Sequence, residues 1–424
     1  MRILVTAAAG FIGSAIVARL QSEGHETVSC VRNPSAHVPG EVRVVDFATA
    51  TQSDWLSQLA DVDAVVNCVG VLQDSVRDST EDAHASGAKR LFNACERAGV
   101  RKVIHFSAAG ADKPLTKFSE TKHRGDQSLM ASRLDWIVLR PSVVVGPAAY
   151  GGSALFRGLA AMPVLPLMPA TGPLQIVQLS DVVETVLKLL QPEAPSRLVL
   201  EVAGPERLEM RDVVGMYRSW LGWKKQPIWL LPSFAAAALY KLGDFAGWLG
   251  WRPPLRSTAR LEIARGATGD TRAWTEATGI VPQSLPQALR SQPASVQEHW
   301  FARLYFLKPI VFGVLSLFWI GTGLISLGPG WPIGMDILRQ GGVGDIAPLA
   351  IAAGALADIA IGVGIAFRRT ARLALYAGVL LSLAYAIIGT VVAPQLWSDP
   401  LGPMFKIWPI IVLLLVALAI RGDR

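Results

Sequence analysis

Cysteine is scarce in this sequence, and neither cysteine nor histidine is arranged as a metal site. Only 3 cysteines occur among 424 residues, and all of them (Cys30, Cys68 and Cys95) lie near the start. The 6 histidines are scattered and have no partner at metal-ligand spacing. We therefore expect reduced thiols and no metal centre, rather than a disulfide framework.

Runs of basic residues interleaved with aromatic residues are also missing. The formal net charge of +7 is spread along the chain, so we expect no nucleic-acid partner. A signal peptide is not expected either, because the apolar run Ile3–Val5 is far too short for its hydrophobic region. The N-terminal domain should therefore stay in the compartment where it is made.

Apolar residues, in contrast, are in excess. They make up 51% of the sequence, and the mean hydropathy of +0.37 is above the norm for globular proteins. Membrane-spanning segments are therefore expected. A chain of 424 residues also favours about two or three domains.

The first stretch of the chain has the pattern of a strand, a turn of small residues and a helix. The charge-free run Ile3–Val5 is typical of a strand buried on both faces of a parallel sheet. Apolar residues then recur at helical spacing from Ile12 until Gly24. The free N–H groups and the dipole at the start of such a helix attract an anion. Small side chains in the turn would let a pyrophosphate approach the backbone.

Strand-like and helical patterns continue to alternate after this turn. The expected strands cover 27–31, 42–47, 64–69, 102–106 and 136–139, and the expected helices cover 53–59, 82–98 and 119–132. This alternation predicts an α/β Rossmann domain, which is a doubly wound parallel sheet that binds ligands at the carboxyl ends of its strands.

The residues that follow three of these strands indicate a dinucleotide. Arg32 takes the place where a carboxylate would bind the ribose of NAD, so NADP(H) is favoured over NAD(H). A solvated surface arginine is the alternative. Asp46 would reach the adenine amino group, with Phe47 packed alongside it or simply in the core. Asn67 begins a turn of small residues that leaves the backbone open to the cofactor.

A serine, Ser107, follows the fifth strand, and the run Phe118-Ser119-Glu120-Thr121-Lys122 begins the next helix. Together with the turn Thr6–Gly13, this pattern resembles the extended and atypical branches of the short-chain dehydrogenase/reductase superfamily. Those proteins pair a TGxxGxxG turn with a Ser and with Tyr-x-x-x-Lys, whose two side chains share one helix face. In the family the Lys holds the nicotinamide ribose and lowers the pKa of the Tyr, which exchanges a proton with the substrate.

The resemblance implies roles for residues of this chain. Ser107 and Lys122 would act in catalysis, and Lys122 would also bind the cofactor. The glycine turn would contact the cofactor through Thr6, Ala7, Ala9, Gly10, Phe11, Ile12 and Gly13.

Two positions depart from the family pattern. The first glycine of the turn is Ala7, which is tolerated if its backbone keeps a negative φ. The tyrosine position is Phe118, which has no proton to give, so the usual acid/base is absent. Lys122 can still contact the ribose, so the resemblance implies cofactor binding more directly than catalysis. Tyr150 is an alternative phenol, and an ordinary loop residue is the other interpretation of it.

The run Leu139–Pro147 resembles the RPSxxxGP turn of the atypical branch, which includes the NADPH-binding accessory subunit of respiratory complex I. That likeness implies that Pro141, Ser142 and Val143 line the nicotinamide end. The ordered motifs cover about residues 1–300. We place the Rossmann domain and a small substrate-side subdomain at 1–223.

The segment 224–304 is predicted to be an amphipathic stretch followed by a linker. Tryptophans and basic residues border the apolar run Leu230–Leu249, a composition that suits a helix at a bilayer surface. A helix buried on the sheet is the alternative. Arg256–Gln297 is polar with weak helical patterns, which indicates a linker.

Residues 305–424 are predicted to form a four-helix transmembrane domain. Spans are expected near 309–328, 347–367, 372–393 and 405–421, because about 20 mostly apolar residues cross a bilayer. Basic residues cluster before the first span, between the second and third spans, and at the end of the chain. The positive-inside rule then places both termini and the Rossmann domain on the cytoplasmic side of the inner membrane.

The four-span block resembles the DoxX-like membrane family, a likeness that assigns no chemistry. Asp358 lies within the second span, where a charge is costly, so it should face the bundle interior. A functional group is one interpretation of Asp358. A structural hydrogen bond to Ser382 or Tyr385 is the other.

Two functions are consistent with this sequence. The first is a membrane-anchored NADP(H)-dependent oxidoreductase, or an epimerase-like enzyme, that acts on a lipophilic molecule such as a quinone or an isoprenoid intermediate. The apolar stretch Gly151–Gly172, expected over the nicotinamide end, favours it. The second is a non-catalytic NADP(H)-binding module that stabilises or regulates a membrane redox complex, which Phe118 favours. A transporter working through Asp358 is a distant third.

Overall fold

The computed structural model describes residues 1–34, 37–74 and 78–422, and the chain divides into two compact units. Unit 1 contains Met1–Asp244 and Pro253–Ala302, and unit 2 contains Phe245–Arg252 and Arg303–Arg424. The division falls inside two helices, α8 (Ser233–Trp248) and α12 (Val296–Leu327).

Unit 1 is built on a seven-stranded sheet in which every pair of neighbours is parallel. The strands are β1 (Arg2–Thr6), β2 (Glu26–Val31), β3 (Glu41–Val44), β4 (Ala64–Asn67), β5 (Lys102–Phe106), β6 (Asp135–Pro141) and β10 (Leu198–Val202). Their order, β10-β6-β5-β4-β1-β2-β3, confirms the predicted doubly wound Rossmann sheet. The order reverses between β1 and β4, which is where such sheets bind ligands.

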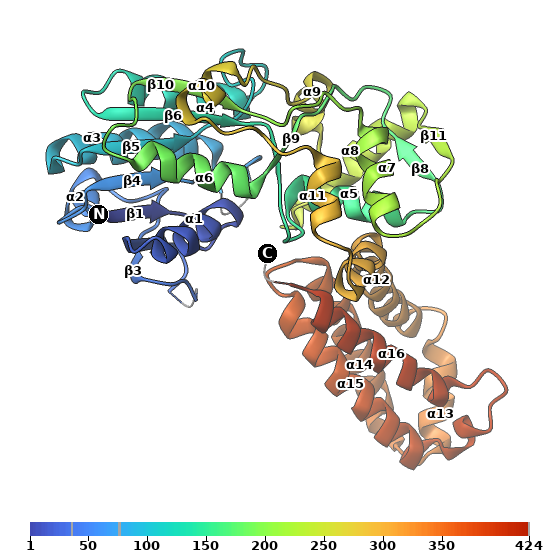
Figure 1. Cartoon of the computed structure of the whole chain (residues 1–424). Helices are drawn as coiled ribbons and strands as arrows, with labels where there is room; N and C mark the ends of the chain where they lie inside the picture. The colour runs from blue at the N-terminus through green and yellow to red at the C-terminus, as the bar shows by residue number, and fades with distance from the viewer. Residues whose placement is uncertain (35–36, 75–77, 423–424) are drawn as a thin grey trace. The chain divides into compact units, whose positions relative to one another are not determined.

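Helices cover both faces of this sheet (Figure 1). They are α1 (Phe11–Ser22) and α6 (Leu179–Leu190) on one face, and α2 (Gln52–Gln58), α3 (Gly87–Ala98) and α4 (Lys117–Met130) on the other. Each layer has its own core, with Val17 and Val186 in the first and Trp55 and Phe92 in the second, all at most 1% exposed. Burying a large apolar side chain of this kind contributes about 1.5–3 kcal/mol.

The expected elements are found, with differences at their ends. The strand expected at 42–47 is β3 and stops at Val44, because Asp46 begins a turn in which its carbonyl accepts from the N–H groups of Thr49 and Ala50. The helix expected at 82–98 starts as a π-helical turn, η1 (Glu81–Ser86), before α3. The alternation also continues beyond Tyr150, since β10 adds a strand that the sequence pattern did not predict.

Residues beyond β6 add two small parallel sheets and several helices to unit 1. Strands β7 (Val143–Val145) and β9 (Ile176–Gln178) form one pair, and β8 (Leu165–Leu167) and β11 (Ile228–Leu230) the other. The helices are α5 (Gly151–Ala161), α7 (Met210–Trp220), η2 (Ser257–Ala259), α9 (Arg260–Arg265), α10 (Arg272–Thr278) and α11 (Leu285–Ser291).

The polar segment 256–297, for which the sequence indicated a linker, packs into unit 1. Its Trp274 is fully buried, and the indole Nε1 donates to Thr185 Oγ1 at 2.9 Å. One large aromatic residue therefore anchors a stretch whose average composition is polar.

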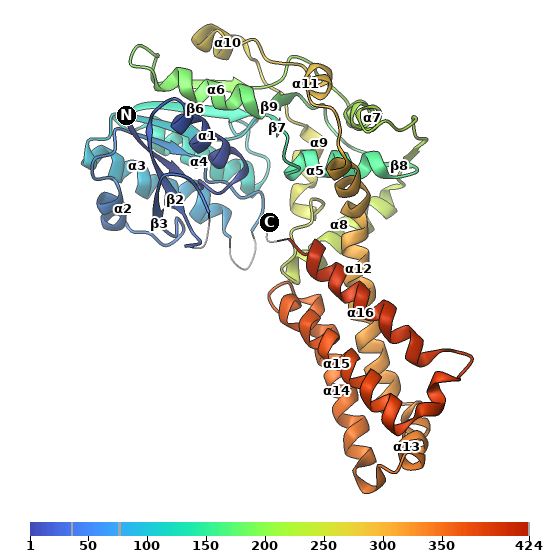
Figure 2. The ribbon, with the colours of Figure 1, turned by 60° about the horizontal axis from the view of Figure 1, so that its bottom comes forward.

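Unit 2 contains four helices that are long and apolar enough to cross a membrane, and they lie side by side (Figure 2). They are α12, α14 (Ala347–Ala366) with η3 (Gly344–Ile346) before it, α15 (Ala371–Val392) and α16 (Pro403–Ile420). These confirm the four expected spans, although the first helix begins at Val296, earlier than predicted. Two short helices that the sequence did not predict lie in the connections, α13 (Trp331–Gln340) and η4 (Pro394–Trp397).

Asp358 faces the interior of this bundle, as predicted. It is 6% exposed, and its Oδ1 accepts a hydrogen bond from the Tyr385 hydroxyl at 2.9 Å, which joins α14 to α15. A small residue makes room for this contact, because a Cβ on Gly354 would lie 3.0 Å from the Tyr385 hydroxyl oxygen. Of the two partners that the sequence offered, Tyr385 is the one that bonds.

Candidate functional site

The turn between β1 and α1 lies where the strand order reverses. The Gly10 N–H donates to the Ala7 carbonyl at 2.8 Å, and the Ser14 N–H donates to the Gly10 carbonyl at 2.9 Å. Ala7 has a φ of +50°, so the condition under which an alanine is tolerated without strain at this position, a negative φ, is not met. That left-handed conformation costs an alanine about 1 kcal/mol. It persists because strand and helix are packed closely: a Cβ on Gly13 would lie 2.4 Å from the Ala7 carbonyl oxygen.

The start of α1 has the features of an anion site. Among the described residues, no side chain caps it, and its N-cap position is Gly10. The amides of Phe11, Ile12 and Gly13 are therefore among the first-turn donors that a helix leaves unsatisfied. The preceding residues 6–9 are threonine and alanine, so a pyrophosphate could reach these amides without meeting a large side chain.

Side chains at the ends of β1, β4 and β5 form a buried hydrogen-bonded chain. Thr6 Oγ1 donates to Asn67 Oδ1 at 2.7 Å and accepts from the Cys68 N–H at 3.0 Å. The Asn67 amide nitrogen, which can only donate, lies 3.0 Å from His105 Nδ1. Burial holds the pKa of His105 well below its ordinary value, so the ring is neutral and carries its proton on Nε2. Asn67 therefore binds neighbouring strand ends together.

Phe118 and Lys122 share one face of α4, as the resemblance implied. Lys122 is 4% exposed. Its Nζ donates to the Phe106 carbonyl at 2.8 Å and to the Val69 carbonyl at 3.3 Å, and so reaches the ends of both β5 and β4. Burial lowers the pKa of Lys122 to about 8. A Cβ on Gly70 would lie 3.4 Å from this nitrogen, so Lys122 borders the turn where the backbone is open.

Asp126, one helical turn beyond Lys122, belongs to a buried cluster that the sequence analysis missed. Its Oδ2 accepts from Arg140 at 3.0 and 3.2 Å, and its Oδ1 lies 3.6 Å from His105 Nε2. Burial raises the pKa of Asp126, and the Arg140 charge opposes that rise. The cluster fixes α4 against β5 and β6. The four-residue spacing of Lys122 and Asp126 was the available signal.

Ser107 lies directly after β5, one residue beyond the carbonyl that Lys122 contacts. Its N–H donates to the Leu139 carbonyl at 2.7 Å, which fixes its backbone to β6. Its buried hydroxyl faces the Asp126 carboxylate, and a hydrogen bond to that carboxylate opposes the rise in the pKa of Asp126.

His84 is a second residue that the sequence did not single out. Its Nε2 accepts from the Val71 N–H at 3.0 Å, so its proton is on Nδ1, which lies 3.0 Å from Thr121 Oγ1. Its ring meets Phe118 edge-on with centroids 5.5 Å apart, and burial holds its pKa far below the ordinary value. His84 lies in the π-helical turn η1, and such turns are frequent at functional sites.

The residues predicted for the adenine end lie after β2 and β3. Arg32 Nη1 is 2.8 Å from Asp78 Oδ1, and the Arg32 side chain is 54% exposed. Asp46 is exposed at its turn. Phe47 is 9% exposed and meets Trp55 edge-on with centroids 5.6 Å apart, which places it in the core. The cofactor roles of these three residues stay predictions.

The residues predicted for the nicotinamide end connect β6 to β7. Pro141 ends β6 and Val143 begins β7. Between them, the Ser142 hydroxyl donates to the Gln175 carbonyl at 2.6 Å, and its N–H donates to the Val202 carbonyl at 2.9 Å. These two hydrogen bonds fix the backbone of this connection, and a rigid backbone is what the wall of a binding site requires.

Tyr150, the alternative phenol, lies at the N-cap of α5 and is 47% exposed. Its ring stacks on Phe11, with centroids 5.3 Å apart and planes inclined by 12°. A Cβ on Gly146 would lie 3.4 Å from the same Phe11 ring. The chain after β7 therefore approaches the glycine turn through Phe11.

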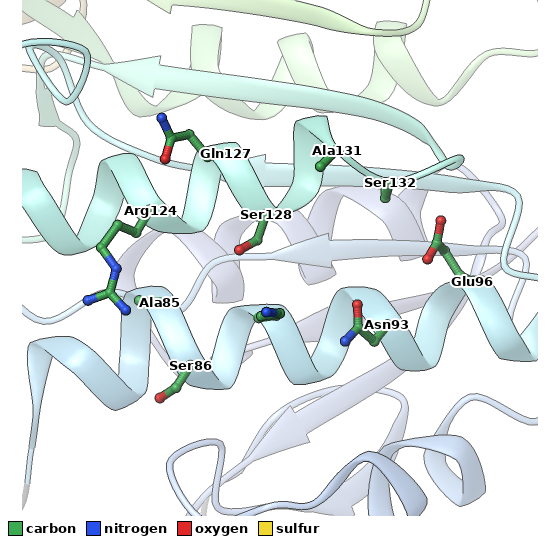
Figure 3. Close-up of a pocket in the computed structure, with 10 residues that line it drawn as sticks. Ala85, Ser86, Asn93, Glu96, Arg124, Gln127, Ser128, Ala131 and Ser132 are labelled. Carbon is green, nitrogen blue, oxygen red and sulfur yellow. The ribbon is translucent and has the colours of Figure 1, made fainter.

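A hollow of about 560 Å³ lies between α3 and α4 and is lined mainly by polar side chains (Figure 3). None of the residues that line it is among those predicted to bind cofactor. Across residues 1–34, 37–74 and 78–422, no group of three or more His, Cys, Asp or Glu side chains is placed to hold a metal ion.

The residues present at the strand ends fit a nicotinamide dinucleotide. An uncapped helix start suits the pyrophosphate, and the buried Lys122 ammonium borders an open backbone turn. The contacts of the individual residues with a dinucleotide stay predictions.

Comparison with known proteins agrees with this geometry. Residues 7–156 match a family model described as NAD(P)H-binding, and residues 316–415 match the DoxX-like family. The solved structure of the Bordetella bronchiseptica enzyme WbmG in complex with NAD is similar in fold, with a TM-score of 0.56 and 17% identity, over 72% of this chain and 96% of that one.

Two curated relatives are similar to parts of the chain. A ceramide reductase of Caulobacter vibrioides is 24% identical over 184 residues, which is 42% of this chain and 57% of the reductase. The 40 kDa subunit of mitochondrial NADH-ubiquinone oxidoreductase from Neurospora crassa is 28% identical over 150 residues, which is 34% of this chain and 40% of the subunit. The chain thus joins a Rossmann domain that matches an NAD(P)H-binding family model to a region that matches the DoxX-like family, which contains four apolar helices among the described residues.

Proposed function

We propose that this chain is a membrane-anchored, NADP(H)-dependent reductase of a lipophilic molecule such as a quinone or an isoprenoid intermediate. The observation that carries the proposal is the position of Lys122, whose buried ammonium contacts the end of β5 beside Ser107 and borders the open turn after β4. Similarity to a ceramide reductase supports a lipid-like substrate. The four apolar helices support delivery of that substrate from a bilayer.

The residues of this chain would hold the cofactor in three places. The turn amides of residues 6–13 would bind the pyrophosphate, Lys122 would bind the nicotinamide ribose, and Arg32 would bind a 2′-phosphate, which favours NADP(H). When bound, the cofactor supplies a hydride. Ser107 would orient the substrate oxygen with its buried hydroxyl.

Phe118 requires the proton of this reaction to come from elsewhere. Without a positioned phenol, water or the substrate itself would supply it, at a cost that reaches about 10²–10⁴-fold in rate. The chain would therefore be a slow reductase, or one whose substrate carries its own acidic proton.

The test is NADPH oxidation by the full chain in lipid nanodiscs that contain quinones or isoprenoid carbonyl compounds. Lys122→Ala should abolish NADPH binding and turnover together. Lys117→Ala is the matched control, because Lys117 lies on the same helix but is exposed and paired with Asp74. Binding that survives Lys122→Ala would contradict the assigned role of this residue, and inertness across a broad lipid panel would overturn the enzymatic proposal.

A non-catalytic NADP(H)-binding module of a membrane redox complex is the second candidate. Phe118 and the similarity to the 40 kDa complex I subunit favour it. In this case NADPH should bind with no turnover for any lipid, and a membrane redox complex should co-purify in mild detergent. Turnover by the isolated chain, with no partner present, would exclude this candidate.

We propose the cytoplasmic side of the inner membrane for the Rossmann domain and both termini, because of where the basic residues lie. Arg368, Arg369 and Arg372 occupy or border the turn between α14 and α15, and Arg421 follows α16. Positive residues favour the cytoplasmic side. A C-terminal fusion to alkaline phosphatase should be inactive and a fusion to a green fluorescent protein should be fluorescent, and the reverse pattern would overturn this orientation.

A further inference from the structure

The loop 108–116 joins the two residues on which the candidate site depends. Ser107 precedes the loop, directly after β5, and Lys122 lies in the second turn of α4, which begins directly after the loop. The loop therefore sets how these two side chains lie relative to each other. It is contacted by α9, a short helix that also belongs to unit 1 but lies far along the chain.

Arg265, the last residue of α9, holds the first half of this loop. Its Nη1 lies 3.0 Å from the Gly110 carbonyl oxygen and 2.9 Å from the Lys113 carbonyl oxygen. The approach requires a glycine, because a Cβ on Gly110 would lie 2.6 Å from Arg265 Cζ and the φ of Gly110 is +76°. The N–H groups of a guanidinium point in fixed directions, so one arginine fixes two carbonyl groups relative to each other.

Glu262, three residues earlier in α9, holds the other end of the loop. Its Oε1 accepts a hydrogen bond from the Thr116 hydroxyl at 2.5 Å. Thr116 is the N-cap of α4, and its Oγ1 accepts from the Ser119 N–H at 3.4 Å. An ionised carboxylate can only accept, so the Thr116 proton points to Glu262 and the lone pairs are left for the helix amide. Glu262 therefore orients the cap that begins α4.

Glu262 and Arg265 also form an ion pair with each other. Their side chains are only 13% and 20% exposed. Removing one partner would leave the other charge largely buried and uncompensated. We call the two side chains the α9 clamp, because together they hold the loop at Gly110, near its start, and at Thr116, where it ends.

The same stretch of chain also bonds to the segment that supports the predicted nicotinamide wall. The Ile263 carbonyl accepts from the Gly172 N–H, and the Ala267 carbonyl accepts from the Gln175 N–H, both at 2.9 Å. The Gln175 carbonyl in turn accepts from the Ser142 hydroxyl. Residues 262–267 therefore connect the loop after β5 with the connection after β6, which are the two parts of the chain predicted to lie at the nicotinamide end.

We infer that Glu262 and Arg265 are positioning residues of the candidate site, which hold the loop 108–116 so that Ser107 and Lys122 stay in place for the nicotinamide end of a dinucleotide. The inference rests on the proposed function for the identity of its ligand. Neither clamp residue touches the ligand in this scheme, and both act through the start of α4. The residues predicted for the adenine end follow β2 and β3, at one edge of the sheet, so the clamp should affect only half of the dinucleotide.

The test compares two ligands of the full chain in detergent. NADPH occupies both ends of the site, whereas adenosine 2′,5′-bisphosphate reproduces only its adenine end. Arg265→Ala removes both bonds to the loop, and Arg265→Lys keeps a charge that can donate to one carbonyl. Arg272→Ala is the matched control, because Arg272 is an arginine of the same polar segment whose side chain is 83% exposed and paired with Asp270.

Arg265→Ala should weaken NADPH binding about tenfold, which is the scale on which lost hydrogen bonds change an equilibrium. Its affinity for adenosine 2′,5′-bisphosphate should stay unchanged. Arg265→Lys should recover part of the loss, and Arg272→Ala should match wild type with both ligands. Unchanged NADPH affinity in Arg265→Ala would overturn the inference. Equal weakening of both ligands would also overturn it, because the substitution would then have disturbed the fold in general.

Hydrogen exchange of the ligand-free chain separates this inference from the proposed function. The amides of the loop 108–116 should exchange faster in Arg265→Ala and in Glu262→Ala than in wild type, while those of β1 should not change. If wild type binds NADPH and the loop exchanges at the same rate in all three proteins, the inference alone is wrong. If wild type binds no NADPH, the proposed function is wrong, and the positioning role for a dinucleotide falls with it.

Discussion

At the scale of single residues, Ala7 shows how a tertiary constraint overrides a local preference. Its φ of +50° is unfavourable for alanine, and glycine adopts it freely. We expect Ala7→Gly to leave the free energy of unfolding unchanged or to raise it by up to about 1 kcal/mol, because relieved strain offsets the entropy that glycine adds to the unfolded chain.

Ala9→Gly is the control for Ala7→Gly, since Ala9 lies in the same turn without a positive φ. It should destabilise unit 1 by about 0.5–1 kcal/mol. Thermal unfolding of both variants measures the difference. Equal destabilisation by both substitutions would mean that the positive φ of Ala7 does not lower the free energy of unfolding.

Phe118 is the residue that separates the two proposed functions. Its ring lies edge-on to His84 and on the same helix face as Lys122, so a tyrosine there would restore the family arrangement. If the chain is a reductase, Phe118→Tyr should raise kcat by about ten- to a thousandfold with unchanged NADPH affinity, because a positioned acid contributes about 10²–10⁴-fold.

The Phe118→Tyr measurement is steady-state NADPH oxidation with saturating lipid substrate. Phe118→Leu is the control for loss of the ring and should not accelerate turnover. A Phe118→Tyr variant that binds NADPH normally and still turns over nothing would favour the non-catalytic module.

Lys122 should make the stability of unit 1 depend on pH. Its folded-state pKa of about 8 lies below the ordinary value of 10.5, so between these two values the unfolded chain binds more protons than the folded chain. The Lys122 contribution to the free energy of unfolding therefore rises with pH across this window, by about 3 kcal/mol at most. Lys122→Met should remove that rise.

The comparison for Lys122 is the difference between wild type and Lys122→Met in chemical unfolding at several pH values from neutral to alkaline. The contributions of the other titrating groups are the same in both proteins and cancel in this difference. Parallel pH profiles for the two proteins would show that burial does not penalise the Lys122 charge.

At the scale of elements, local patterns predicted six of the seven strands of the large sheet and the helices α1 to α4. Strand β5 and helix α4 follow from apolar runs and helical spacing, and the motif residues Ser107 and Lys122 lie where those elements place them. The cluster of His105, Asp126 and Arg140 could not be predicted in the same way. The four-residue spacing places Asp126 on the same face of α4 as Lys122, but the partners of Asp126 depend on the register of β5 against β6, which no local pattern gives.

Other elements escaped prediction for different physical reasons. The π-helical turn η1 has an apolar spacing close to that of an α-helix, so the sequence predicted an uninterrupted helix. Strand β10 and the segment around Trp274 have mostly polar neighbours in the sequence. The average composition of these stretches therefore gives no sign of the few residues that are buried. The spans of unit 2 were predictable because long charge-free runs have few alternatives.

The contact between α14 and α15 through Asp358 and Tyr385 is a prediction at this scale. Tyr385→Phe removes the hydroxyl that donates to the Asp358 carboxyl group. Hydrogen bonds between membrane helices contribute about 0.6 kcal/mol on average and up to about 1.7 kcal/mol. We expect Tyr385→Phe to lower the melting temperature of the detergent-solubilised protein by a few degrees.

Asp358→Asn is the companion variant, because an amide can still accept from Tyr385 without carrying a charge. It should cost less stability than Tyr385→Phe. A Tyr385→Phe protein as stable as wild type would assign the contact no structural role and would bring back the functional interpretation of Asp358.

At the scale of the whole molecule, the unfolding of the two units can be followed separately, because the cysteines lie in only one of them. All 3 cysteines of the chain, Cys30, Cys68 and Cys95, lie in unit 1, and unit 2 has none. Cys30 and Cys95 are buried, so a fluorogenic thiol reagent reacts with them as unit 1 unfolds. NADPH should stabilise unit 1 by about 2.7 kcal/mol at a hundredfold excess over its dissociation constant.

The expected result is a thiol-reactivity midpoint that rises with NADPH concentration. The unfolding of unit 2, followed by proteolysis at the α13 region, should stay unchanged, because mass action stabilises only the cooperative unit that binds the ligand. NADH at the same concentration should shift the midpoint less, and Arg32→Ala should remove the difference between the two nucleotides. A midpoint insensitive to both would leave unit 1 without a cofactor.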